Sequence, residues 1–85
     1  MLGIVGMGKL GSAFARGFLN AGVKVIAYDR QEEKLELEGL RKASSPEEVF
    51  ERSEVVFLAV KPDAMAPLIK DAPKGKILVS PAAKL

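Results

Sequence analysis

Hydrophobic positions along this chain fall into short apolar runs separated by amphipathic segments. The runs at 1–5, 23–28, 55–60 and 76–80 predict strands, and a brief edge strand is expected at 40–43. The run at 55–60 is apolar without interruption. Such a run is typical of a central parallel strand covered by helices on both faces.

The segments between these runs predict helices. Gly22 can end the first helix in the left-handed conformation, and a short charged helix is expected at 31–38. Ser45, Pro46 and Glu48 together form a strong helix start, with a cap, a first-turn proline and a capping-box glutamate. A further helix is expected at 63–70. In the first helix the apolar residues at helical spacing are Leu10, Ala13, Phe14, Gly17, Phe18 and Ala21.

The resulting order of elements is β-α-β-α-β-α-β-α-β. Because such alternation implies right-handed crossovers, it predicts an α/β fold of the Rossmann type, with a doubly wound parallel sheet. We expect five strands in the order 3-2-1-4-5, with a ligand crevice where strands one and four part. Residues 1–85 are interpreted as one dinucleotide-binding domain.

Composition removes several classes of function. The 85 residues include no Cys and no His, so no disulfide, thiolate metal site or histidine acid–base group is expected. The formal net charge of +2 does not indicate a nucleic-acid partner, and no apolar run reaches the roughly 20 residues of a membrane span. We expect a cytoplasmic protein. Its short, polar third strand leaves one sheet edge open, which favours a homodimer or a marginally stable monomer.

A glycine motif lies between the first strand and the first helix. In this context Gly6 can make the tight turn, Gly8 lets the backbone approach a pyrophosphate, and Gly11 permits close packing of helix on strand. The helix N-terminus offers unpaired N–H groups to the phosphates. The candidate cofactor-binding residues of this loop are Gly6, Met7, Gly8, Lys9, Leu10 and Gly11.

Two charged residues at the end of the second strand bear on the choice of cofactor. Asp29 follows Gly11 by 18 residues (29 − 11) and is placed to accept hydrogen bonds from an adenosine ribose. Its charge favours NAD, whereas Arg30 could pair with the 2′-phosphate of NADP. We therefore expect NAD or NADP, with NAD favoured. The structural alternative is that the glycines only shape a turn and Asp29 is a solvated charge.

Three segments carry a family resemblance: 3–13 around the glycine loop, Phe57 to Pro62, and Ser80 to Ala83. Over essentially the whole chain they resemble the cofactor domain of pyrroline-5-carboxylate reductases. The resemblance implies that Val60, Lys61 and Pro62 contact the cofactor. It also implies hydride transfer from NAD(P)H to the imine of 1-pyrroline-5-carboxylate, which gives proline.

The chain also departs from that family. Lys84 stands where the family's last loop usually has glycine, and the family has a following helical domain for dimerisation and substrate binding. We therefore expect an incomplete catalyst. No catalytic residue is assigned, although Ser80 is a candidate proton donor. The alternatives are a β-hydroxyacid dehydrogenase-like domain, a deazaflavin-dependent NADP reductase-like domain, and a non-catalytic cofactor-binding or structural module.

Overall fold

A computed structural model describes residues 1–59 and 77–79 of the chain. Its parallel sheet has five strands in the order β3-β2-β1-β4-β5, which confirms the predicted topology. β1 lies at the centre and pairs with both β2 and β4, so the chain reverses its winding direction there. The strands are β1 (Leu2–Val5), β2 (Val25–Tyr28), β3 (Arg41–Lys42), β4 (Val55–Leu58) and β5 (Ile77–Val79).

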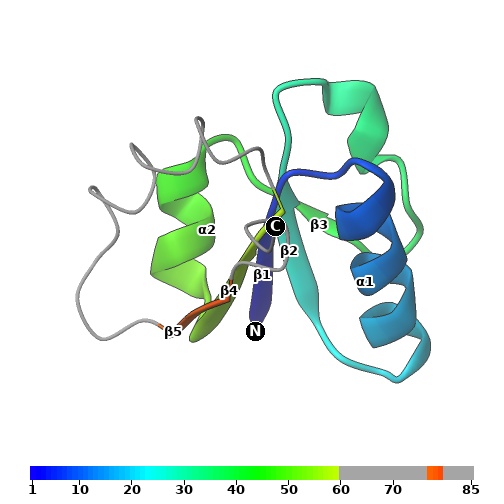
Figure 1. Cartoon of the computed structure of the whole chain (residues 1–85), viewed down its shortest axis with the longest axis horizontal. Helices are drawn as coiled ribbons and strands as arrows, with labels where there is room; N and C mark the ends of the chain where they lie inside the picture. The colour runs from blue at the N-terminus through cyan, green and yellow to red at the C-terminus, as the bar shows by residue number, and fades with distance from the viewer. Residues whose placement is uncertain (60–76, 80–85) are drawn as a thin grey trace, which may run out of the picture.

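Helices cover both faces of the sheet (Figure 1). Helix α1 (Lys9–Asn20) and the 3₁₀-helix η1 (Glu32–Leu35) lie on one face, and α2 (Pro46–Arg52) lies on the other. Neighbouring strand residues alternate between the two resulting cores, as the pleat of a strand requires. The core under α2 comprises Val5, Ile26, Ala43, Val49, Phe50, Val56 and Leu58. The core under α1 comprises Ile4, Met7, Ala15, Val25, Ala27 and Leu35.

The face that α1 turns towards the sheet matches the predicted one only in part, because Phe14 and Phe18 pack against the core under α1 as expected but other predicted residues do not. Gly11 and Ala15 are its buried residues, whereas Leu10 is 42% exposed and Ala13 is also exposed. The small residues Gly11 and Ala15 allow α1 to lie very close to β1. A Cβ atom on Gly11 would collide with the carbonyl oxygen of Gly6. Close backbone approach, rather than the largest apolar side chains, therefore sets the rotation of this helix.

The predicted charged helix at 31–38 is wrong in its extent, because η1 contains only four residues. Leu35 is buried and Leu37 is half-buried, and both pack into the core under α1. An α-helix would point residues two positions apart in nearly opposite directions, so the chain leaves the helical conformation after Leu35. The predicted second strand likewise starts later, at Val25. The helix expected at 63–70 lies outside the described residues.

Candidate functional site: the glycine loop and its cleft

The glycine loop follows β1 directly and leads into α1 at the carboxyl edge of the sheet. Gly6 has φ of 99°, a conformation that favours glycine, and its N–H donates to the Tyr28 carbonyl at 2.8 Å. Gly11 lies so close to this turn that a side chain there would meet the backbone of Gly6. Both glycines are therefore required by the fold itself.

Gly8 has no such internal reason to be glycine. It is the N-cap of α1, with φ of −73° and ψ of −158°, an extended conformation outside the positive-φ region that favours glycine. The residue is exposed, and a Cβ atom added there would meet nothing within 4 Å. The missing side chain instead leaves open space beside the start of the helix, where a ligand can approach the backbone.

The first turn of α1 presents backbone donors to that space. Gly8 makes no side-chain capping hydrogen bond, and the first turn contains no acidic residue. The Ser12 N–H donates to the Gly8 carbonyl at 2.9 Å, whereas the amides at 9–11 have no acceptor within the helix. Together with the positive end of the helix dipole, these amides suit an anionic group such as a pyrophosphate.

Asp29 joins the loop from the end of β2. Its Oδ2 accepts a hydrogen bond from the Met7 N–H at 2.6 Å, and its Oδ1 accepts one from the Gln31 N–H at 2.8 Å. Asp29 is half-buried and Arg30 beside it is exposed. The structure thus brings Asp29 to the glycine loop, as the motif predicts, although its recorded partners there are backbone amides.

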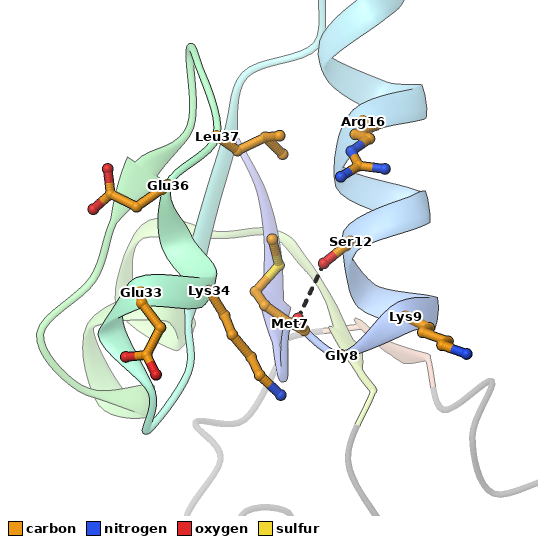
Figure 2. Close-up of a pocket in the computed structure, with 9 residues that line it drawn as sticks. All are labelled: Met7, Gly8, Lys9, Ser12, Arg16, Glu33, Lys34, Glu36 and Leu37. Carbon is orange, nitrogen blue, oxygen red and sulfur yellow. Dashed lines mark hydrogen bonds between the residues drawn. The ribbon is translucent and has the colours of Figure 1, made fainter.

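A cleft of about 520 Å³ runs between α1 and η1 (Figure 2). This volume falls within the range of small-molecule sites. Three predicted residues line the cleft, namely Met7, Gly8 and Lys9. Sequence reasoning missed the remaining lining residues, which are Ser12, Arg16, Glu33, Lys34, Glu36 and Leu37. The helical spacing of Lys9, Ser12 and Arg16 was a signal for one wall, whereas nothing in the sequence placed η1 opposite them.

The charged side chains along the cleft include three cations, Lys9, Arg16 and Lys34, and two carboxylates, Glu33 and Glu36. Glu36 is already paired, because its Oε2 accepts a hydrogen bond from the Lys42 Nζ at 2.8 Å. That hydrogen bond raises the pKa of Lys42 above its ordinary value. Lys34 extends towards the Met7–Gly8 end of the cleft, whereas Lys9 points away from it (Figure 2). Lys34 is therefore the cation placed beside the helix N-terminus, whereas Arg16 lies about two turns further along α1.

The other predicted residues stand apart from the cleft. Gly6 and Gly11 shape the loop without lining the cavity, and the Leu10 side chain lies at the surface. The predicted contacts Val60, Lys61 and Pro62 lie outside the described residues. Within 1–59 and 77–79 no group of three or more His, Cys, Asp or Glu residues is arranged to hold a metal ion.

A parallel sheet of this order, with a glycine loop opening the helix after its central strand, defines a Rossmann-type dinucleotide-binding unit. The chain belongs to the family described as "NADP oxidoreductase coenzyme F420-dependent", whose model matches residues 1–84.

Sequence relatives refine this assignment. The chain is 35% identical over 92 residues to the pyrroline-5-carboxylate reductase of Treponema pallidum, a match that covers 96% of this chain and 35% of the relative. It is 42% identical over 62 residues to a probable mitochondrial 3-hydroxyisobutyrate dehydrogenase-like protein of Arabidopsis thaliana, covering 69% of this chain and 21% of the relative. The predicted resemblance to pyrroline-5-carboxylate reductases is confirmed.

Solved structures of imine reductases share the fold of this chain. The imine reductase of Streptomyces aurantiacus superimposes with a TM-score of 0.87 at 26% identity, over 98% of this chain and 32% of that one. The imine reductase of Myxococcus stipitatus, solved with NADP⁺, gives a TM-score of 0.87 at 26% identity, over 94% of this chain and 31% of that one. The chain thus spans about a third of the length of these proteins.

Proposed function

We propose that residues 1–85 form the cofactor domain of an NAD(P)H-dependent imine reductase, with the cofactor pyrophosphate on the amides that open α1. The observation that carries this proposal is Gly8, whose missing side chain the fold does not need and whose surroundings are open. A pyrophosphate approaching the amides at 9–11 would pass over this position. Lys34 and Arg16 would supply positive charge along the neighbouring cleft.

Gly8→Ala is expected to weaken NADH and NADPH binding at least roughly tenfold, because the new methyl group would hold a phosphate away from charge-assisted hydrogen bonds. Isothermal calorimetry of the purified chain measures the two affinities. Gly17→Ala is the matched control. It lies on the same helix, and its new Cβ also meets nothing within 4 Å. This control should keep wild-type affinity and gain up to about 1 kcal/mol of helix stability.

Two results would contradict the assignment. If Gly8→Ala and Gly17→Ala bind NADH equally well, the glycine at position 8 does not serve the cofactor. If the folded wild-type chain binds neither NADH nor NADPH, the loop is structural in this chain.

The proposed reaction is reduction of a cyclic imine of the 1-pyrroline-5-carboxylate class. Support comes from the Treponema pallidum relative and from the imine reductases that share the fold. The nicotinamide would supply the hydride, while the chain's own residues bind and orient the dinucleotide. Catalytic and substrate-binding groups are not assigned to this chain. We therefore expect cofactor binding by the 85-residue chain without turnover of 1-pyrroline-5-carboxylate.

A second candidate is a β-hydroxyacid dehydrogenase domain, favoured by the identity of 42% to the Arabidopsis dehydrogenase-like protein. The described site does not separate the two, because both reactions would use the same dinucleotide platform. An extended chain that transfers hydride to a pyrroline imine, and does not oxidise 3-hydroxyisobutyrate, would decide for the first candidate.

The finer features of the proposal concern cofactor choice, assembly and location. NAD is proposed over NADP because a carboxylate at Asp29 stands where the adenosine ribose is expected. We also propose a homodimer and a cytoplasmic location. No described helix is long and apolar enough to cross a membrane.

A further inference from the structure

The peptide groups around Met7 are held from two sides by side chains of different elements. From the end of β2, Asp29 accepts the Met7 N–H through Oδ2 at 2.6 Å. From the first turns of α1, the Ser12 hydroxyl donates to the Met7 carbonyl at 3.0 Å, the dashed line in Figure 2. Met7 itself is only 2% exposed, so its side chain also anchors this part of the loop in the core.

Met7 lies where these contacts can control the direction of the backbone that opens α1. It lies between the turn at Gly6, with φ of 99°, and the open N-cap at Gly8. Any rotation of the Met7 peptide groups would redirect Gly8 and the amides that follow it. A hydrogen bond to a carboxylate is stronger than one between neutral groups, so Asp29 contributes the stiffer half of this restraint.

We propose that Asp29 and Ser12 form a Met7 clamp, and that both are positioning residues for the cofactor site. This inference rests on the proposed function. Through the clamp, Asp29 supports binding of a dinucleotide whether or not a 2′-phosphate is present. A role limited to charge repulsion predicts the opposite for NADP, because removing the carboxylate would then strengthen its binding.

The clamp is tested by titrating three ligands: NADH, NADPH, and an NADH analogue whose adenosine ribose lacks both hydroxyl groups. Asp29→Ala should weaken all three roughly tenfold or more, and Ser12→Ala should weaken them roughly two- to tenfold. Asp29→Asn keeps one acceptor oxygen and should recover part of the loss. Glu51→Ala removes an exposed carboxylate from α2 on the opposite face and should leave every affinity unchanged.

Two outcomes of this titration would overturn the clamp. The first is tighter NADPH binding by Asp29→Ala, which would assign the carboxylate to charge discrimination. The second is an unchanged affinity of Asp29→Ala for the analogue without ribose hydroxyls, which would assign Asp29 to a direct ribose contact alone.

Amide hydrogen exchange of Met7 in the ligand-free chain gives a readout that does not depend on cofactor binding. Asp29→Ala and Ser12→Ala should speed this exchange, whereas Glu51→Ala should not. If wild type binds cofactor but Met7 exchange is unchanged in both Asp29→Ala and Ser12→Ala, the clamp is wrong and the proposed function stands. If exchange speeds up while wild type binds neither cofactor, the proposed function fails, and with it the clamp's role in binding.

Discussion

Gly3, in the middle of β1, shows how a single small residue sets the distance between a helix and the sheet. A Cβ atom there would lie 2.6 Å from Cγ1 of Val49 and closer still to the Ser53 hydroxyl. Ser53 is 0% exposed, and its Oγ has no hydrogen-bond partner among the described residues. This glycine therefore serves packing under α2, in contrast to Gly8, which faces open space.

Gly3→Ala is expected to lower the free energy of unfolding by about 1–3 kcal/mol, because the added methyl group overpacks the contact with α2. Ser53→Ala should raise the free energy of unfolding, since it removes a buried hydroxyl that has no hydrogen-bond partner among the described residues. The free energy of unfolding of the double variant should be higher than the sum of the two single effects predicts, because the alanine at position 53 relieves part of the collision. Urea unfolding of wild type, the two single variants and the double variant measures the four free energies that this double-mutant cycle needs. Strictly additive effects would show that the two side chains do not compete for the same space.

The roles of several residues could be predicted from the sequence alone. The spacing of Gly6, Gly8 and Gly11 after a strand identified the turn, the open approach and the close packing. The partners of Asp29 could not be predicted, because an acidic residue at the end of β2 can face a ribose or a backbone amide. That choice depends on how the loop folds back over β2, since Met7 and Asp29 are 22 positions apart.

At the scale of elements, the start of α2 follows its sequence signal closely. Ser45 is the N-cap, and its hydroxyl accepts the Glu48 N–H at 3.2 Å, with Pro46 at the first helical position. The expected return contact of Glu48 differs by one residue. Its Oε1 accepts from the Ser44 N–H at 2.8 Å and from the Ser44 hydroxyl at 3.0 Å. The glutamate therefore ties down the residue before the cap.

These contacts give α2 a pH-dependent stability. The hydrogen bonds from Ser44, followed by the nearby charge of Arg52, lower the pKa of Glu48 below its ordinary value of 4.5. Because the lowered pKa belongs to the folded state, the unfolded chain takes up this proton first as the pH falls. The contribution of Glu48 is thus present above pH 4.5 and is lost as the pH falls through the lowered pKa.

Denaturant unfolding from pH 7 down to pH 3 should therefore show a smaller loss of stability for Glu48→Gln than for wild type. Glu47→Gln, an exposed carboxylate in the same helical turn, is the matched control and should follow wild type. An identical pH profile for wild type and Glu48→Gln would show that Ser44 does not favour the ionised carboxylate.

The whole molecule carries an apolar surface beside α1 that bears on its assembly. The rings of Phe14, Phe18 and Phe57 are only partly buried, and their centroids lie 5.2 to 6.4 Å apart. Leu10 adds to this surface one turn earlier on α1. The edge strand β3 offers a poorer interface, because its two residues are both basic and exposed. A homodimer would therefore form through the aromatic surface rather than through β3.

Sedimentation equilibrium should show a concentration-dependent dimer for wild type. Leu10→Gln should shift the population towards monomer, because it makes this surface more polar at little cost in helix propensity. Val23→Thr changes another exposed apolar residue, 38% exposed and outside α1, and should leave the equilibrium unchanged. A monomeric wild type with high thermal stability would contradict the proposed dimer.

The sequence by itself determined the architecture and the class of ligand. Alternating apolar runs and helical segments imply a doubly wound sheet, because parallel strands need helical crossovers of one hand. Glycines spaced for a turn, an open approach and a tight packing contact indicate a dinucleotide, because these demands are local to six consecutive residues. Local steric and hydrogen-bonding rules are enough for both conclusions.

Only the tertiary structure decided the rotation of α1, the early end of the helix expected at 31–38, the cleft, and the contacts that hold Met7. Each depends on surfaces that meet across the fold. The close approach of Gly11 to Gly6 turned Leu10 outward, and the packing of both Leu35 and Leu37 into the core under α1 ended the helical turn. Contacts of this kind are set by packing between elements, which the spacing of residues within one segment does not contain.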